Sequence, residues 1–135
     1  MGRKVAQVVA YSFKKHFAED ILSGRKKQTI RAHRKRHARP GEHLQLFTGM
    51  RTKHCKKVLE PDPVCVAVTN IRIRVPSSFE PCAVTMSGNT FYVDDEFARL
   101  DGFASSEEFT RFWFENHGTG YFEGVLIAWE MESAA

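Results

Sequence analysis

The sequence has few cysteines and no long apolar run. Its three cysteines, Cys55, Cys65 and Cys82, are odd in number and form no C-x-x-C pair, so a disulfide framework is not expected and a reducing cytoplasm is the natural compartment. No apolar stretch approaches the roughly 20 residues of a membrane-spanning helix, and Gln7 and Tyr11 interrupt any leader-like segment at the start. A soluble cytoplasmic protein without membrane attachment is therefore expected.

Linkers, internal repeats and low-complexity tracts are also missing. A length of 135 residues fits one ordinary domain, so residues 1–135 are predicted to form a single unit. The chain is 42% hydrophobic and contains 11 Phe, a composition that excludes a disordered protein. A domain of this size buries roughly two-thirds of its unfolded surface.

Acidic residues are almost absent from one segment. Residues 25–57 hold twelve Lys and Arg and a single acid, Glu42, whereas the remainder holds eight Lys and Arg and fifteen acids. The net charge of +4 therefore hides a strongly basic segment on an acidic body. Such a segregated field concentrates anions in one place, which favours RNA or a nucleotide as the partner.

The first third of the chain alternates strand and helix patterns. Residues 5–13 are apolar enough for a strand, and Ser12 is placed to cap a following helix. That helix is expected to bury one stripe of side chains and to end at Gly24; the stripe comprises Phe13, Phe17, Ile21 and Leu22. Strands are predicted at 28–32 and 44–48, and 49–63 is predicted to be a basic loop.

The remainder is rich in strands. Residues 64–75 alternate strongly, with a change of phase near Thr69 and Asn70 that predicts a bulge or a bend there. A strand pair is expected within 83–93, a helix after Ser105, which has capping-box spacing to Glu108, and a last strand at 121–131. The order predicts an α+β fold: a small β-barrel of mainly antiparallel strands, flanked by two or three short helices.

Three side chains in the segment from Gly24 to Arg31 are expected to converge. If 28–32 is a strand, Thr29 and Arg31 share a face, and Lys26 in the preceding turn reaches the same cleft. An ammonium, a hydroxyl and a guanidinium together suit a phosphate group. The alternative is a solvated basic turn.

These residues lie in a longer pattern that resembles a known family. Gly-x-Lys-x-x-Thr-x-Arg at 24–31 follows Phe17–Ser23 and precedes Arg39-Pro40-Gly41-Glu42-His43-Leu44, and Asp101-Gly102-Phe103-Ala104-Ser105 comes before a helix. This pattern is similar to the ASCH domain, a resemblance that covers most of the chain and implies a PUA-like β-barrel. Thr29, where many members have Glu, is similar to the small bacterial members that hydrolyse N4-acetylcytidine.

The resemblance implies a catalytic lysine, threonine and glutamate, and the aspartate that this chain offers for the last of these is one methylene shorter. Lys26 and Thr29 match the first two, and Asp101 is the closest match to the acid, with Glu107 and Glu108 nearby. A lysine with a lowered pKa would take a proton from Thr29 or from water, and the carboxyl group would serve the leaving amine. Repulsion from neighbouring cations is expected to lower the pKa of Lys26; these are Arg25, Lys27 and Arg31.

The remaining cations are predicted to bind nucleic-acid or nucleotide phosphates through the loops 31–39 and 51–57. The predicted phosphate-binding residues are Arg25, Lys27, Arg31, Arg34, Lys35, Arg36, Arg39, Arg51 and Lys53. Solvated loops that keep the protein soluble are the alternative. No metal or other cofactor is expected, because His33 and His37 lack a helical apolar pattern and are surrounded by cations.

Several aromatic residues complete the candidates. Phe47, Tyr92 and Phe103 are candidates for stacking on a base, while Trp113 and Trp129 are predicted to be packing residues. The leading hypothesis is an RNA- or nucleotide-binding module, and an amidohydrolase acting on an acylated cytidine is the alternative. A nuclease is a weaker third possibility, and the acidic C-terminal third could meet a basic protein partner or be a solvated face. The oligomeric state does not follow from the sequence.

Overall fold

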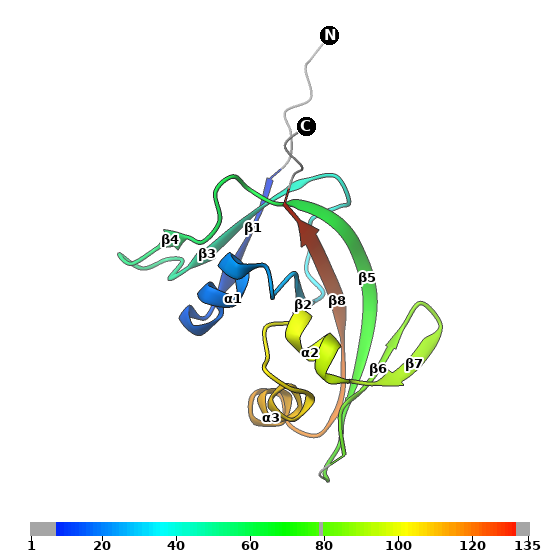
Figure 1. The fold of residues 1–135 in the computed structure, drawn as a ribbon. Helices are drawn as coiled ribbons and strands as arrows, with labels where there is room; N and C mark the ends of the chain where they lie inside the picture. The colour runs from blue at the N-terminus through cyan, green and yellow to red at the C-terminus, as the bar shows by residue number, and fades with distance from the viewer. Residues whose placement is uncertain (1–7, 79, 132–135) are drawn as a thin grey trace.

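The computed structural model describes residues 8–78 and 80–131, in which a mixed sheet of eight strands packs against three α-helices (Figure 1). The elements in chain order are β1 (Val8–Phe13), a 3₁₀ turn η1 (Lys15–Phe17), α1 (Ala18–Ser23), β2 (Gln28–Ala32), β3 (His43–Thr48), β4 (Lys56–Lys57), β5 (Val64–Val75), β6 (Ala83–Met86), β7 (Asn89–Tyr92), α2 (Asp95–Leu100), α3 (Ser106–Asn116) and β8 (Gly120–Glu130). The α+β class predicted from the sequence is confirmed.

Strand β5 organises the sheet. It pairs antiparallel with β8 along its whole length, and its other side pairs with β3 at one end and β6 at the other. Strand β2 adds to β8, β1 lies parallel to β3, and β7 adds to β6. Within the described residues no backbone ladder joins β1 to β2, so the sheet is not closed into a barrel.

Two arginine side chains bridge the gap between β1 and the segment that begins with β2. Nη2 of Arg31 donates to the carbonyl oxygen of Ser12 at 2.6 Å, and Nη2 of Arg34 donates to that of Ala10 at 3.4 Å. Each guanidinium also lies over an aromatic ring, that of Arg31 4.7 Å from the centre of Phe13. Side chains therefore satisfy carbonyl groups at an edge where a strand neighbour is missing.

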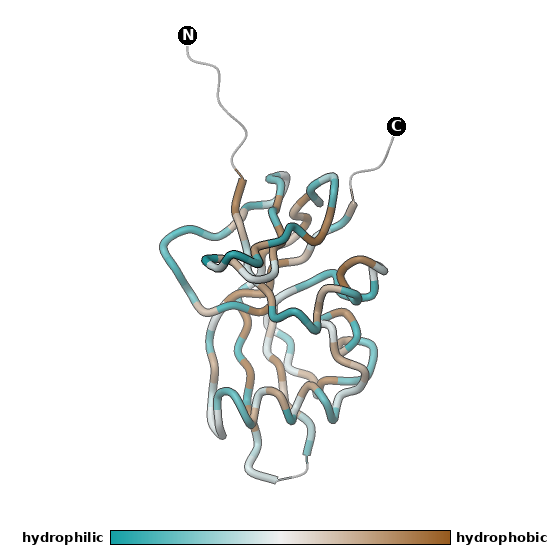
Figure 2. The backbone as a smooth tube through the Cα atoms, turned by 90° about the vertical axis from the view of Figure 1, so that its left-hand side faces the viewer, coloured by the Kyte–Doolittle hydropathy of each residue, from teal (hydrophilic) through white to brown (hydrophobic). Residues whose placement is uncertain are grey.

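The helices cover one side of the curved β5–β8 pair, and the β6–β7 hairpin projects on the other (Figure 1). Alternate residues of β5 point into the core, where Ile71, Ile73 and Val75 are buried, while Arg72 and Arg74 between them are exposed. Figure 2 shows that hydrophobic and hydrophilic stretches follow one another along the backbone. The burial pattern is the one that a half-buried strand requires.

The boundary between the first strand and the first helix differs from the prediction. Ser12 is a strand residue, because the β1–β3 ladder continues to Phe13 and Thr48 and takes up the backbone that a helix start would need. The 3₁₀ turn follows, and α1 begins only at Ala18. A six-residue helix has room for little buried surface, so Ile21 is buried whereas Leu22 is 62% exposed.

Three further predictions need correction. The segment 49–63 is not only a loop, because Lys56–Lys57 form β4 against β3. The bulge in β5 lies between Cys65 and Ala67, where the register with β8 shifts, and not near Thr69. The sequence interpretation also missed α2, whose cap is the Asp94 carboxylate accepting from the Phe97 amide at 2.8 Å.

Other boundaries are confirmed. Gly24 ends α1 with a φ of 83°, and the Ser105 hydroxyl caps α3 by accepting from the Glu108 amide at 3.2 Å. Residues 5–7 of the predicted first strand lie outside the described residues. In the described part of the chain, no helix is long and apolar enough to cross a membrane.

Candidate functional site

A pocket of about 220 Å³ opens where β1, β2 and the ends of α2 and α3 meet. Lys26, Thr29 and Arg31 all line it, so the predicted convergence of these three side chains is present. The rest of the wall is mainly aromatic, consisting of Phe13, Phe17, Phe103, Phe112 and Trp113. A small apolar pocket with a few convergent polar groups has the usual character of a ligand site.

Backbone contacts hold Lys26 at the bottom of this pocket. After the turn at Gly24, the amide of Lys26 donates to the carbonyl of Asp20 at 2.9 Å, and that of Lys27 donates to the carbonyl of Leu100 at 2.9 Å. These two hydrogen bonds join the turn to both α1 and α2. The lysine side chain is consequently directed inward, and the residue is only 3% exposed.

The ammonium group of Lys26 has few polar neighbours. Nζ donates to the carbonyl oxygens of Gln28 at 2.8 Å and of Asp101 at 2.5 Å. It also lies 4.8 Å from the ring centre of Phe17 and 5.5 Å from that of Phe13. Water is thus largely replaced by two carbonyl groups and two ring faces, which leaves the charge poorly solvated.

Asp101 supplies the carboxylate of the pocket from the C-terminal end of α2. It is 4% exposed, and its Oδ1 lies 3.9 Å from Nζ of Lys26. Within the described residues, this oxygen is buried without a hydrogen-bond partner. The sequence interpretation placed Asp101 ahead of a helix, and the structure places it directly after the helix that the interpretation missed.

Burial shifts both ionisation equilibria of this pair towards the neutral forms. Desolvation lowers the pKa of Lys26 from 10.5 to about 8, and the charge of Arg31 lowers it further while Asp101 opposes the shift. Desolvation raises the pKa of Asp101 from 3.8 to about 6, against the attraction of Lys26. Both groups therefore titrate near neutral pH, as catalytic acids and bases do.

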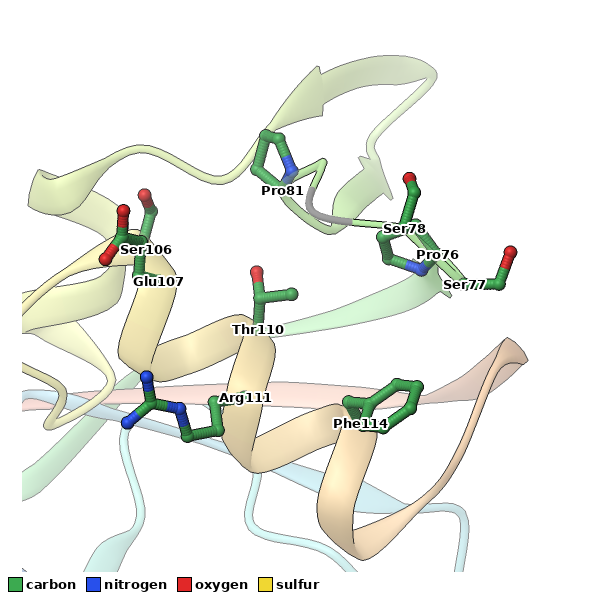
Figure 3. Close-up of a pocket in the computed structure, with 9 residues that line it drawn as sticks. All are labelled: Pro76, Ser77, Ser78, Pro81, Ser106, Glu107, Thr110, Arg111 and Phe114. Atoms are coloured by element: carbon green, nitrogen blue, oxygen red, sulfur yellow. The ribbon is translucent and has the colours of Figure 1, made fainter.

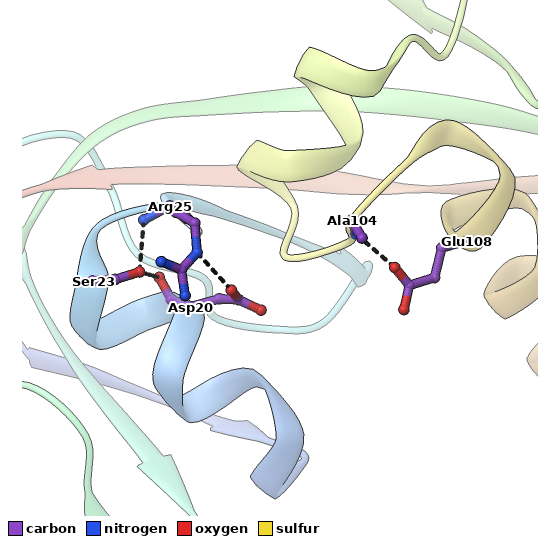
Figure 4. Close-up of polar contacts among 5 residues, drawn as sticks. All are labelled: Asp20, Ser23, Arg25, Ala104 and Glu108. Carbon is purple, nitrogen blue, oxygen red and sulfur yellow. Dashed lines mark hydrogen bonds and ion pairs between the residues drawn. The ribbon is translucent and has the colours of Figure 1, made fainter.

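The cause predicted for the lysine shift was wrong in part. Repulsion was expected from Arg25, Lys27 and Arg31, but burial is the main cause and only Arg31 contributes among these cations. Arg25 turns to the surface, where its Nε lies 3.0 Å from Oδ1 of Asp20 (Figure 4). Lys27 is exposed.

Arg31 fixes the hydroxyl of Thr29. Nε of Arg31 donates to Oγ1 of Thr29 at 2.9 Å, and burial lowers the pKa of the guanidinium to about 10. The hydroxyl oxygen accepts this hydrogen bond, so its own proton remains available to a base or a ligand. Thr29 is 5% exposed, and the hydrogen bond from Arg31 orients its hydroxyl within the pocket that Lys26 and Asp101 also line.

The other two acids considered from the sequence lie elsewhere. Oε2 of Glu108 accepts from the amide of Ala104 at 2.6 Å, so it supports the start of α3 (Figure 4). Glu107 lines a separate hollow of about 660 Å³ between α3 and residues 76–78 and 81 (Figure 3). Both acids and Arg111, which shares that hollow, are exposed. Asp101 is therefore the carboxylate that serves the pocket.

The predicted phosphate-binding residues do not form one continuous surface. Arg36 forms an ion pair with Glu42 at 2.6 Å, and Arg34 donates to the carbonyl of Arg36 at 2.8 Å. Exposed cations that have no ionic partner among the described residues occur near the two ends of β3. Before His43 lie the loop cations, Lys35 and Arg39; after Thr48 lie the hairpin cations, Arg51, Lys53 and Lys56.

The aromatic residues proposed for base stacking also lie in different parts of the structure. Phe103 lines the pocket, whereas Phe47 and Tyr92 do not. Trp129 is a packing residue, 3% exposed, as predicted. Trp113 is also buried in the core, as predicted, but in addition it lines the pocket, and its Nε1 is buried without a hydrogen-bond partner in the described structure. Its helical spacing with Phe109 indicates burial and gives no sign of this second role.

No group of three or more metal-binding side chains gathers in the described residues. His37, one of the two histidines considered, hydrogen-bonds through its ring to the Tyr11 hydroxyl at 3.0 Å and the Ala32 carbonyl at 2.9 Å.

Comparisons of the chain with protein-family models, curated proteins and solved structures found no match.

Proposed function

We propose that this chain is an amidohydrolase that removes the acyl group from an N-acylated pyrimidine nucleoside such as N4-acetylcytidine. The carrying observation is the buried Lys26–Asp101 pair beside the oriented hydroxyl of Thr29, inside an aromatic pocket. This proposal builds on the resemblance to the ASCH family. We favour hydrolysis over ligand binding alone as the function of this pocket, because a binding site needs no carboxylate buried against a lysine.

The pair suits the two proton transfers of amide hydrolysis. Neutral Lys26 accepts a proton from the Thr29 hydroxyl or from a water as that oxygen attacks the acyl carbon. The carboxyl group of Asp101 then delivers a proton to the exocyclic nitrogen, so that the amine departs neutral. When water attacks, the acyl group leaves as a carboxylic acid; when Thr29 attacks, the acyl group stays on its oxygen as an ester, which a water activated by Lys26 then hydrolyses. The nearby guanidinium of Arg31 favours the negative charge that develops on the acyl oxygen.

The size and walls of the pocket restrict the ligand. About 220 Å³ is below the roughly 300–1,000 Å³ of pockets that enclose drug-sized ligands. A single ring with a short acyl group suits such a volume, and the sugar then lies outside. The rings of Phe103 and Trp113 offer stacking surfaces, and the unpaired Nε1 of Trp113 is a donor for a ligand oxygen.

The proposal extends to the fold. The family resemblance implies a PUA-like barrel, and we infer that this chain is an open variant of it. Arg31 and Arg34 bridge the seam at β1 where strand pairing would complete a closed barrel.

The decisive experiment measures release of cytidine from N4-acetylcytidine by chromatography. Lys26→Ala is expected to lower turnover by about 100- to 10,000-fold, the usual contribution of one acid–base group. Lys27→Ala is the matched control, because it removes an adjacent exposed ammonium and leaves the pocket intact. Absence of turnover by the folded wild-type protein would contradict the proposal.

A second candidate function, binding of an RNA backbone, rests on a separate observation. The loop cations and the hairpin cations lie near opposite ends of β3, a six-residue strand. Such a strand is roughly 20 Å long, so a polyanion that crosses it can meet both groups. The two functions are compatible, since the substrate of the enzyme can be an acylated cytidine that is part of an RNA chain.

A further inference from the structure

The outer face of strands β5 to β8 carries a regular arrangement of side chains that the proposed activity does not use. The strand register aligns Tyr121, Arg74, Ala83 and Tyr92 in one row across four strands. The next row consists of Glu123, Arg72, Thr85 and Thr90. Residues paired in this way project from the same face of a sheet.

This face is directed away from the core. Ile71 and Ile73, the neighbours of Arg72 in β5 that point the other way, are 3% and 0% exposed. On the outer face, by contrast, Tyr92 is 60% exposed and Tyr121 57%. Two large rings thus stand in solvent on either side of two arginines.

The centre of the arrangement is hollow. Ala83 is the smallest residue of its row, and it lies between Arg74 and Tyr92. Around it the surface forms a hollow of about 410 Å³, whose lining includes both arginines and both tyrosines. The hydroxyls of Thr85 and Thr90, 2.9 Å apart, line it as well.

The arginines are available to an anion. The guanidinium of Arg72 lies 4.0 Å from the ring centre of Tyr121, which keeps the group flat and oriented. Its ion pair with Glu123, at 3.6 Å, joins side chains that are 51% and 67% exposed. Such an exposed pair contributes little, so a phosphate can replace the carboxylate. Arg74 has no ionic partner among the described residues.

The spacing of the rings indicates the kind of ligand. Tyr121 and Tyr92 are three strand spacings apart, roughly 14 Å. One base cannot touch both rings, so a free mononucleotide would use only half of the surface. A single strand can stack one base on each tyrosine while its phosphates meet the arginines between them.

We propose that this outer face is a second site, which binds single-stranded nucleic acid by stacking on Tyr92 and Tyr121 and by phosphate contacts with Arg72 and Arg74. The site lies on the face opposite the core and is independent of hydrolysis at Lys26.

The test is fluorescence anisotropy with a labelled oligouridylate of about twelve nucleotides. Tyr92→Ala and Tyr121→Ala are each expected to weaken binding by about 5- to 100-fold, whereas Tyr92→Phe, which keeps a stacking ring, stays within about twofold of wild type. Arg74→Gln should lower the slope of log K against log salt by about 0.7, the value for one phosphate contact on a single strand. Phe114→Ala, at an exposed ring on α3, is the control and should bind as wild type does.

The proposal is overturned if both tyrosine-to-alanine variants bind the oligonucleotide like the wild type. It is also overturned if uridine monophosphate competes as tightly as the oligonucleotide, since the surface would then be a mononucleotide site. Turnover of N4-acetylcytidine should be unchanged in Tyr92→Ala, and this readout separates a failure of this site from a failure of the proposed enzyme.

Discussion

At the scale of single residues, the Lys26–Asp101 pair sets the pH range in which the pocket can act. The active form of the pair holds one proton between the two groups, so activity is lost when that proton leaves or when a second one binds. With pKa values of about 8 for Lys26 and about 6 for Asp101, the state with one proton dominates between those limits, mainly as the ion pair, and the reactive arrangement of neutral Lys26 and protonated Asp101 is in equilibrium with that ion pair. We expect a bell-shaped pH profile of kcat/KM with its maximum near pH 7, measured on N4-acetylcytidine.

The control for this profile is Asp101→Asn. This variant keeps the shape of the side chain and removes its titration, so the acid limb near pH 6 should disappear along with most of the activity. A wild-type profile that stays flat from about pH 5 to 9 would rule out the pair as the acid–base machinery.

The same pair is predicted to reduce the stability of the fold near neutral pH. Because the folded-state pKa of Lys26 is lowered, the unfolded chain binds more protons between about pH 8 and 10.5, and stability rises through that window. The folded-state pKa of Asp101 is raised, so stability falls as pH rises from 3.8 to about 6. Between these windows, both charged forms are held at a cost to the folded state.

We therefore expect the double variant Lys26→Met/Asp101→Asn to be inactive and yet to unfold at a higher urea concentration than the wild type at pH 7. Replacing a buried ion pair with neutral groups of similar size is often neutral or stabilising. The single variant Lys26→Met should be less stable than the double variant, since it leaves Asp101 without its partner. A double variant that unfolds more easily than the wild type would mean that the pair is structural.

Residue-level reasoning from the sequence succeeded where a short-range rule applied. The two-residue period of a strand was sufficient to predict that Thr29 and Arg31 share a pocket with Lys26, which lies in the turn before β2. Asp101 was identified through the family pattern alone, because its approach to Lys26 depends on contacts across 75 residues. Trp113 was missed because burial and pocket lining leave the same helical spacing in the sequence.

At the scale of elements, the connection from α2 to α3 holds the pocket closed on one side, and Gly102 permits its close approach. Its φ is +95°, and a Cβ there would lie 2.7 Å from Cδ of Lys26 and 2.8 Å from Cδ1 of Phe17. Gly118 has a similar φ of +90°, but a Cβ there would meet nothing within 4 Å. Alanine variants at the two positions therefore distinguish the effect of backbone strain, which both share, from the effect of displacing Lys26, which only the variant at Gly102 has.

Gly118→Ala is expected to lower the free energy of unfolding by about 1 kcal/mol, the strain of a left-handed alanine, and to keep full activity. Gly102→Ala should lower the free energy of unfolding by about 1–3 kcal/mol more than Gly118→Ala does, because the added methyl group overpacks the site. Its kcat should also fall, because Lys26 is displaced. Urea unfolding and steady-state kinetics measure both effects. Equal behaviour of the two variants would mean that Gly102 has no part in positioning Lys26.

The long strands β5 and β8 and the shorter β2 and β3 were predicted nearly to their ends, whereas α2 and β4 were not predicted. Helix α2 has six residues and a single buried one, Ala98, so it leaves no apolar period in the sequence. Strand β4 has two residues and depends on its pairing with β3. The boundary at Ser12 was missed because the ladder to β3 prevails over a local capping preference.

At the scale of the whole molecule, residues 25–57 remain rich in cations, but ion pairs with acidic residues neutralise some of these cations and leave others unpaired. Lys57 lies 2.7 Å from Oδ1 of Asp62, and side-chain hydrogen bonding to Asp62 raises its pKa. Arg25 and Arg36 also have acidic partners. Composition could reveal the excess of cations in residues 25–57 but not which of them are neutralised, since that depends on contacts made in the fold.

This division predicts which cations should control binding to RNA. Removing two of the three hairpin cations in the double variant Arg51→Gln/Lys53→Gln should weaken binding and lower the slope of log K against log salt by about 1.4, since each lost phosphate contact on a single strand releases about 0.7 of a counterion. Lys57→Gln, a neighbouring change of the same kind, should leave the slope nearly unchanged because acids already neutralise that charge locally. Anisotropy titrations across a salt series measure the slopes. If Lys57→Gln lowers the slope as much per charge as the hairpin variant does, binding follows net charge alone and the hairpin is not a specific phosphate contact.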